Sequence, residues 1–419
     1  MNNSLLPEST PDRGRLRVEL VNDLTSYPVT DANVRITYSG VPDSPSEILT
    51  PDNSGHTPTI ELPAPPIEYS LDPQSTKQPY SEYTITVTAP GYKAVTISGT
   101  EIFSDTTAIQ RIKLKPDVPG QRSDNFSIGA HTLFASYPEK ISESELKPID
   151  ESGEIVLSRV VIPEYIVVHD GSPRDPTARN YYEKYKDYIK NVACSEIYST
   201  WPANTIRANV LAIMSFTLNR VYTEWYRNQG YNFTITSSTA FDHKWIPGRN
   251  IFDSISVIVD EVFADYLSRP NIRQPILTQY CDGRQVQCPN WMTQWGSKYL
   301  GDQGYSTIEI LRYYYGNNMY INTAEQISGV PASWPGYTLT QGSIGEKVRQ
   351  IQSQLREISK AYPAIPKIAA DGIYGPATSL AVRKFQSVFG LPVTGDVDYR
   401  TWYKISEIYV GVTRIAELS

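Results

Sequence analysis

The chain has 419 residues, which is too long for one ordinary domain and predicts about two to four. Its 38 basic and 45 acidic residues give a net charge of −7, which argues against nucleic acid as the main partner. The chain contains no apolar run long enough for a bilayer, so we expect no membrane span.

The sequence holds 30 tyrosines against 10 phenylalanines. Tyrosine suits a cleft that faces sugars, because its ring stacks on the apolar face of a sugar while its hydroxyl stays hydrogen-bonded. A hydrated β-sheet surface would explain the same excess. The composition therefore leaves both interpretations open.

The N-terminal residues 1–13 are polar and predict a disordered tail. This stretch lacks the apolar centre of a signal peptide, so we expect synthesis without a conventional export signal. The 3 cysteines are an odd number and do not make a disulfide framework.

Residues 14–115 show the period-two pattern of β-strands. Apolar side chains alternate in the runs around Leu16, Val34, Ile85, Val95 and Ile109, with turn residues between the runs. The pattern predicts a small antiparallel β-sandwich without a catalytic cluster. Through its Pro-Val-Thr-Asp-Ala-Asn-Val stretch and its Ala-Pro-Gly-Tyr turn, this region resembles transthyretin-like and carboxypeptidase-regulatory-like modules.

Residues 116–155 are polar and lack a regular apolar period. Such a stretch predicts an exposed linker, where proteases cut most readily. We therefore expect a linker and prosegment here, with one cleavage near Gln121, Arg122 and Ser123 and a prosegment that ends within residues 150–156.

The central domain, expected over residues 156–330, opens with a buried strand from Tyr165 to Val168. The His169-Asp170 pair that follows favours a structural role, because sequence neighbours on a strand point to opposite faces. Two amphipathic helices then flank Glu196, and the second has Asn204 as a plausible N-cap and Gly230 just past its end. Glu196 is thus expected in a break between two packed helices.

Glu196 is a candidate general acid. Most glutamates near helix ends are solvated or cap the helix, and position alone favours that ordinary role. However, Cys194, Ile197, Tyr198 and Trp201 give this carboxyl group an apolar setting, which raises a carboxyl pKa toward the range of a general acid.

After the second helix, the pattern predicts a strand over residues 233–236, a helix over 255–267 and a strand over 275–281. Residues 279–296 concentrate Gly, Trp, Gln and Cys without a regular period, and long ordered loops of this kind are usually functional. Cys281 and Cys288 are too far apart for a zinc knuckle, so free thiols, a disulfide and a metal site all stay open. His243 is the remaining weak candidate ligand; we expect no cofactor and leave zinc open.

The stretch from Tyr188 to Glu196, the Trp201-Pro202 pair, the long helix after it and the Trp-Met-Thr-Gln-Trp-Gly motif at 291–296 together resemble the stage II sporulation protein D family over residues 160–320. Its members are peptidoglycan lytic transglycosylases, and the catalytic glutamate of their Pro-Ser-Glu-like motif maps onto Glu196. Cys194 stands where the family commonly has proline. The resemblance implies a single carboxyl group that acts as acid and then as base.

The C-terminal region, residues 340–419, predicts a compact helical unit. Its Asp-Gly-Ile-Tyr-Gly-Pro-Ala-Thr turn at 371–378 resembles the three-helix peptidoglycan-binding domain over residues 340–407. Under these resemblances we expect substrate contacts from five residues: Tyr198, Trp201, Gln294, Trp295 and Tyr374.

The order of the parts predicts a multidomain α+β protein and resembles the clostridial spore cortex-lytic enzymes. That resemblance implies an inactive precursor in the bacterial spore, at the cortex or its boundary with the coat. It implies spore cortex peptidoglycan as substrate and a subtilisin-like germination protease as the processing partner.

Three other functions remain open from the sequence. One is an N-acetylmuramoyl-L-alanine amidase, which would need zinc or a nucleophile, alone or combined with transglycosylase activity. A second is a phage-type endolysin, which would not need a β-module and prosegment ahead of its catalytic core. A third is a non-catalytic wall binder that enhances a partner amidase and would keep its effect without Glu196.

Overall fold

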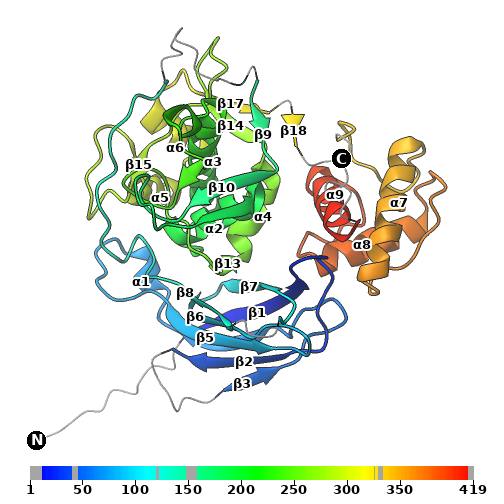
Figure 1. The fold of residues 1–419 in the computed structure, drawn as a ribbon. Helices are drawn as coiled ribbons and strands as arrows, with labels where there is room; N and C mark the ends of the chain where they lie inside the picture. The colour runs from blue at the N-terminus through cyan, green and yellow to red at the C-terminus, as the bar shows by residue number, and fades with distance from the viewer. Residues whose placement is uncertain are drawn as a thin grey trace, which may run out of the picture.

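The structure is a computed structural model that describes residues 12–39, 46–118, 122–147, 157, 159–324, 326–328 and 334–413. It is a multidomain protein of mixed α/β type with several sheets. Figure 1 shows N-terminal strands beneath a central domain, with C-terminal helices at its side. Within the described ranges, no helix has the length and apolar character that crossing a bilayer requires.

Residues 12–127, which we call the β-module, form two sheets. Their strand orders are β13-β7-β1-β4 and β3-β2-β5-β6-β8. The elements of the β-module are β1 (Asp12–Asn22), β2 (Asn33–Tyr38), β3 (Glu47–Leu49), β4 (Ile60–Ala64), α1 (Glu68–Leu71), β5 (Ser81–Thr88), β6 (Val95–Ile102), β7 (Thr107–Leu114) and β8 (Asp124–Ser127).

The alternating apolar pattern forms the core of the β-module. Leu16, Val18 and Leu20 on β1 are fully buried, as expected of one face of a strand. The expectation of a wholly antiparallel sandwich is wrong, because β1 pairs with β7 in parallel and so does β6 with β8. Parallel pairing needs a long connection between the two strands, and the chain between β1 and β7 supplies one.

A short strand of the central domain completes the first sheet of the β-module. This strand, β13 (Ile251–Phe252), pairs antiparallel with β7, placing Ile251 opposite Ile109 and Phe252 opposite Ala108. The β-module and the central domain therefore share a sheet, which holds the two together at the lower side of the central domain (Figure 1).

The central domain packs helices against small sheets. Its other elements are β9 (Val161–Ile162), β10 (Tyr165–His169), β11 (Asn180–Lys184), α2 (Tyr185–Glu196), α3 (Ala203–Tyr222), the 3-10 helix η1 (Arg227–Gln229), β12 (Ile235–Thr236), α4 (Asp253–Val262), β14 (Asp265–Ser268), β15 (Tyr280–Cys281), β16 (Met292–Thr293), α5 (Gln294–Asp302), α6 (Thr307–Tyr315), β17 (Tyr320–Thr323) and β18 (Gln326–Ile327).

The two helices that flank Glu196 are α2 and α3, and the break between them lies where the sequence predicts it. Asn204 is not the N-cap of α3, because Pro202 holds that position with an extended backbone. Helix α3 also ends at Tyr222 rather than near Gly230. It stops there because Glu224 adopts a left-handed φ of 46°, and Gly230 instead follows η1.

Other boundaries of the central domain also differ from those predicted. The helix expected over residues 255–267 ends at Val262, and β14 follows it. Only Tyr280 and Cys281 of the expected strand at 275–281 pair with a neighbour, in parallel with β16. The irregular stretch at 279–296 leads directly into α5, whose glutamine and glycine residues hide its helical period.

The C-terminal module consists of α7 (Glu346–Ala361), α8 (Pro376–Val388) and α9 (Tyr399–Thr413). Two buried glutamines hold its two tight turns. The Oε1 atom of Gln352 accepts the amide of Gly372 at 2.8 Å, and that of Gln386 accepts the amide of Gly395 at 2.9 Å. Both glycines have a left-handed φ, which a residue with a Cβ rarely adopts.

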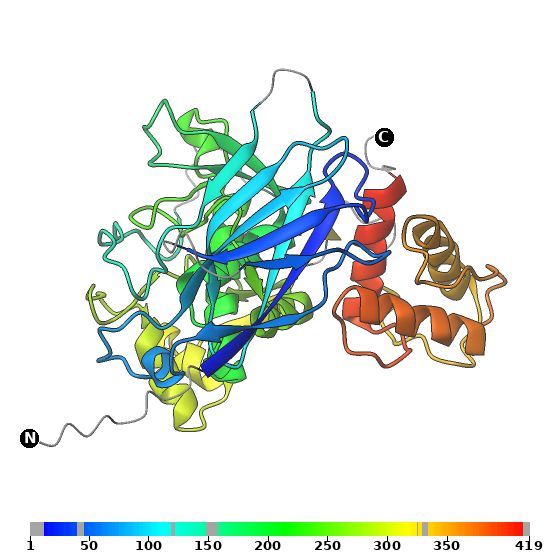
Figure 2. The same cartoon turned by 90° about the horizontal axis from the view of Figure 1, so that it is seen from below.

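Helix α9 attaches the C-terminal module to the central domain. Arg400 forms an ion pair with Glu261 at 2.8 Å, and Glu407 forms one with Lys186 at 2.8 Å. The ring of Tyr403 contacts that of Phe263 at 5.2 Å. Seen from below, the helices lie to one side of the β-module sheets (Figure 2).

Candidate active site

Glu196 is the last residue of α2 and only 4 % exposed. The helix holds it in place through Tyr188, Ile189 and Val192, which are fully buried. The backbone of the next residue, Ile197, is extended, so the chain leaves the helix directly after the carboxyl group. This geometry fixes the side chain at a rigid helix end.

Three neighbours hold the Glu196 carboxyl group. The backbone N–H of Lys244 donates to its Oε1 at 2.6 Å. The side-chain amide of Gln294 donates to the backbone oxygen of Glu196 at 2.9 Å and lies 3.5 Å from Oε2. The hydroxyl of Tyr280 faces the same carboxyl group. The carboxylate therefore has donors ready when it is ionised.

Burial raises the pKa of Glu196 above the ordinary carboxyl value. The charge of Lys140, the hydroxyl of Tyr280 and the amide of Lys244 oppose this shift without cancelling it. A carboxyl group with a raised pKa keeps its proton closer to neutral pH. This property suits a general acid.

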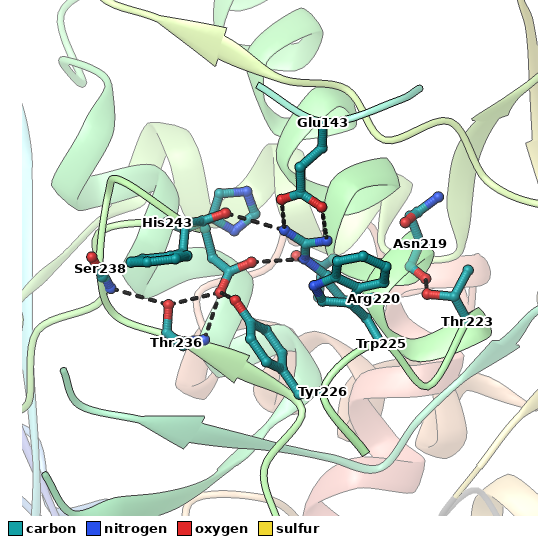
Figure 3. A network of polar contacts seen from close by, with 12 residues as sticks. Glu143, Asn219, Arg220, Thr223, Trp225, Tyr226, Thr236, Ser238 and His243 are labelled. Atoms are coloured by element: carbon teal, nitrogen blue, oxygen red, sulfur yellow. Dashed lines mark hydrogen bonds and ion pairs between the residues drawn. The ribbon is translucent and has the colours of Figure 1, made fainter. Parts of the chain in front are cut away.

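A buried ion-pair network positions the Lys244 amide. Asp242 accepts from Arg220 Nε at 2.7 Å, from Tyr226 at 2.6 Å and from Thr236 Oγ1 at 2.7 Å. Arg220 also donates to the two carboxylate oxygens of Glu143 at 2.6 and 2.9 Å, and Figure 3 shows its guanidinium facing Glu143. The network fixes the turn that leads into Lys244.

Residues 130–147, which we call the strap, cross the central domain in front of Glu196 without helix or strand structure. Thr132 donates from Oγ1 to the backbone oxygen of Ser195 at 3.0 Å. Lys140 donates to the backbone oxygen of Asp242 and lies 5.0 Å above the ring of Tyr280. The strap thus contacts both sides of the Glu196 carboxyl group.

The strap forms the roof of the Glu196 pocket, which has a volume of about 60 Å³. Roof residues are Thr132, Ala135, Tyr137, Pro138 and Lys140, and the walls are Glu196, Thr239, Tyr280, Cys281, Asp282, Gln285, Val286 and Gln294. Pockets that hold small ligands usually have about 300–1,000 Å³. With the strap in place, the pocket is too small for a glycan strand.

Of the five residues expected to contact substrate, Gln294 lies beside Glu196. The other four side chains are buried in the interior, so the structure corrects the expectation for Tyr198, Trp201, Trp295 and Tyr374. The indole of Trp201 packs 5.0 Å from that of Trp295 and donates to the backbone of Ser70 in α1.

The metal candidates are engaged in other contacts. Cys281 and Cys288 form a disulfide, which selects one of the three alternatives left open by the sequence. His243 Nδ1 shares a hydrogen bond with the Tyr188 hydroxyl at 3.1 Å, and burial lowers the pKa of His243 well below its usual value. Among the described residues, no group of three or more His, Cys, Asp and Glu side chains is placed to hold a metal ion.

Two expected cleavage regions have different standing in the structure. Arg122 and Ser123 are exposed and lead into β8, whereas Gln121 lies outside the described residues. The expected end of the prosegment, within residues 150–156, also lies outside them. Thiol Cys194 is buried against Phe252, and burial raises the pKa of Cys194 to about 12.

Sequence reasoning missed several groups at the site. Lys244 acts through its backbone amide, and a backbone contact leaves no signal in residue type. Tyr280 lies in the stretch at 279–296 that the sequence marks as functional, so its position could have been found there. Lys140 lies in a polar segment without any periodic pattern, and nothing in that segment points to Glu196.

The comparisons with known proteins concern the C-terminal module. The model of a peptidoglycan-binding domain family matches residues 344–405. These helices form a peptidoglycan-binding domain. The match makes peptidoglycan a partner of the protein and gives it a function associated with the cell wall.

The chain is also similar to parts of other proteins. It is 42 % identical over 77 residues to a zinc D-Ala-D-Ala carboxypeptidase of Streptomyces albus G, covering 18 % of this chain and 28 % of that enzyme. The SleB N-terminal domain structure is 30 % identical, with a TM-score of 0.17, covering 18 % of this chain and 99 % of its own. Catechol 1,2-dioxygenase from Acinetobacter sp. ADP1 is 11 % identical, with a TM-score of 0.19, covering 28 % and 60 % of the two chains.

Proposed function

We propose that the protein is a peptidoglycan lytic transglycosylase in which Glu196 serves first as general acid and then as general base. The observation that carries the proposal is the single buried carboxyl group at the end of α2, whose pKa burial raises. The carboxylate of Asp282 in the same pocket accepts the amides of Gln285 and Val286 at 2.7 and 2.8 Å, so it holds its own loop. The peptidoglycan-binding domain supplies the attachment to the substrate.

The reaction needs one proton that moves out and back. Protonated Glu196 gives its proton to the glycosidic oxygen, and the bond from that oxygen to the anomeric carbon of the muramic acid breaks. The 6-hydroxyl of the same sugar then bonds to the anomeric carbon and returns its proton to Glu196, closing an anhydro ring. The amide of Lys244 stabilises the carboxylate between the two transfers.

We propose further that this chain is a precursor of a spore cortex-lytic enzyme and that the strap is the inhibitory segment. The strap, rather than the β-module, roofs the Glu196 pocket, and the charge of Lys140 opposes the rise in the pKa of Glu196. Cuts near residues 121–123 and within 150–156, by a subtilisin-like germination protease, would release it. Its departure would open the pocket and raise the pKa of Glu196 further.

The amidase alternative has less support from the geometry. It would need zinc ligands or a nucleophile near the pocket, but Cys281 and Cys288 are paired and the Cys194 thiol is buried against Phe252. An endolysin or a wall binder that enhances an amidase is separated from our proposal by the products and by their dependence on Glu196.

The test uses the full chain with specific protease sites placed at residues 119–121 and 148–156. Purified cortex is treated with the cut chain, and the soluble fragments are analysed by mass spectrometry. We expect anhydro-muramic ends, and a loss of at least about 100-fold in their rate of release with Glu196→Gln. Glu68→Gln, an exposed glutamate on α1, is the matched control and should act like the parent. Reducing ends or free stem peptides would refute the mechanism.

The pH profile gives a second readout. Glu196 must carry its proton at the start, so the rate should hold at low pH and fall as the pH rises through the raised pKa of Glu196. A falling limb at the ordinary carboxyl value would contradict the role of burial.

A further inference from the structure

The central domain holds the strap as it would hold a peptide ligand. The N–H of Ile141 donates to Ala240 O at 2.7 Å, and the N–H of Leu277 donates to Glu145 O at 2.9 Å. These are backbone contacts, in which the groove recognises amide groups rather than particular side chains. Ile141 itself is exposed, so apolar burial of this side chain does not hold the strap.

Gln279 is the centre of this recognition. Its side-chain amide donates to Ile141 O at 2.7 Å and accepts from the N–H of Glu143 at 2.9 Å, so both ends contact the strap backbone. Gln279 is 2 % exposed, and without the strap these contacts would be lost. Leaving a buried polar group without a partner is costly, so the groove favours a ligand with amide groups.

Gln274 extends the same pattern along the groove. Its Oε1 accepts the amide of Lys147 at 3.1 Å, while its buried Nε2 has no hydrogen-bond partner within the described part of the chain. The free N–H donors can meet an acceptor that the strap does not provide. This groove therefore has capacity for a ligand other than the strap.

Arg269 adds a carboxylate site to the groove. Its guanidinium forms two contacts of 2.6 Å with the carboxylate of Glu145. Its Nη1 also donates to the backbone oxygen of Tyr315 at 2.6 Å, which orients the guanidinium independently of the strap. A pre-oriented arginine fork binds carboxylates with defined geometry.

We propose that the groove formed by Gln274, Leu277, Gln279 and Arg269 binds the acidic stem peptide of peptidoglycan, and that the strap occupies this subsite in the precursor. The proposal rests on the function proposed above. Stem peptides carry amide groups along their length and free carboxylates, which are the two chemistries that the groove recognises. Gln279 directly precedes Tyr280, which faces Glu196, so a bound peptide would place its glycan near the acid.

The test measures binding rather than cleavage. The full chain carries Glu196→Gln, to spare the ligand, and the protease sites described above. After cutting, gel filtration removes the strap, and mass spectrometry checks its departure. Calorimetry then compares a soluble disaccharide-peptide from peptidoglycan with the same disaccharide after removal of its peptide.

We expect cutting to strengthen binding of the peptide-bearing fragment by about 10-fold or more, with little change for the bare disaccharide. Arg269→Gln in the cut chain should weaken binding of the peptide-bearing fragment by about 10- to 100-fold and leave the bare disaccharide unaffected. Arg227→Gln is the matched control, because Arg227 lies on η1 and pairs with Glu224 outside the groove. The peptidoglycan-binding domain is present in every sample, so its contribution cancels.

A synthetic peptide of residues 137–147 provides a measurement that does not depend on Arg269 variants folding. It should compete with the peptide-bearing fragment, and its Glu145→Gln form should compete about 10-fold less well. Equal losses for both fragments, no gain on cutting, or a strap that excess fragment fails to displace would each overturn the proposal. Anhydro products that are absent from the parent would instead sink the transglycosylase while leaving the binding result standing.

Discussion

The β-module and the strap both cover the central domain, but the attachments differ in kind. The β-module shares a sheet through β13 and buries Arg249 against Glu101 at 2.6 Å, with both side chains at most 1 % exposed. The strap has no regular structure and is held by Glu143, Glu145 and backbone contacts near the surface.

This difference indicates different fates. An attachment made of strand pairing and buried groups releases only when a large part of the fold opens. An attachment made of partly exposed ion pairs on an irregular segment can be lost locally. The comparison predicts that a cut chain keeps its β-module and loses its strap.

The largest effect should come from breaking the buried pair beneath the β-module. Arg249→Met leaves the Glu101 carboxyl group buried without its partner, and the free energy of unfolding should fall by about 3–5 kcal/mol. Denaturant unfolding followed by β-module signals measures it. The double variant Glu101→Gln with Arg249→Met should recover much of the loss, and equal losses for the single and double variants would contradict the argument.

The second effect concerns acid. Burial opposes the charge of Glu19 on β1, but Arg111, His56 and Arg17 outweigh it and lower the pKa of Glu19 to about 2. A lowered carboxyl pKa stabilises the fold above the ordinary value of 4.5 and loses this contribution as the pH falls through about 2. The shift corresponds to about 3 kcal/mol. Unfolding measured from pH 7 to pH 2 should show this loss, and Glu19→Gln should flatten it.

The smallest effect should be local to the strap. Glu143→Gln removes the charge that Arg220 binds, and opening of the strap should become easier by about 1.5–3 kcal/mol. Hydrogen exchange of the Ile141 and Glu143 amides would speed up by about 10- to 150-fold, while the amides of β1 would not change. Glu139→Gln, an exposed strap glutamate, is the control. Equal acceleration in the β-module would show that the two attachments are not separate.

The sequence predicted the parts of the fold that local periodicity controls. The alternating residues around Leu16, Val34 and Ile85 lie in strands, because each side chain on a strand faces either the core or solvent. The pairing of β13 with β7 was missed, since a strand of two residues has no period and its partner lies far away in the chain.

The candidate site was predicted only in part, for a similar reason. Glu196 stands out because apolar residues surround it in the sequence itself. Lys244, Tyr280 and Lys140 reach the same carboxyl group from distant segments through a backbone amide, a hydroxyl and an amine. Tyr198 and Trp201 were misassigned because an aromatic residue near a catalytic group can face either a sugar or the core.

The shared sheet also bears on how the chain folds during synthesis. The ribosome completes β7 well before it reaches Ile251, so one edge of the first sheet waits without β13 while the central domain is made. Contacts between such distant segments form late and slowly. The β-module is then a preformed surface on which α2 and α4 can assemble, and a central domain made without it would begin folding with that surface missing.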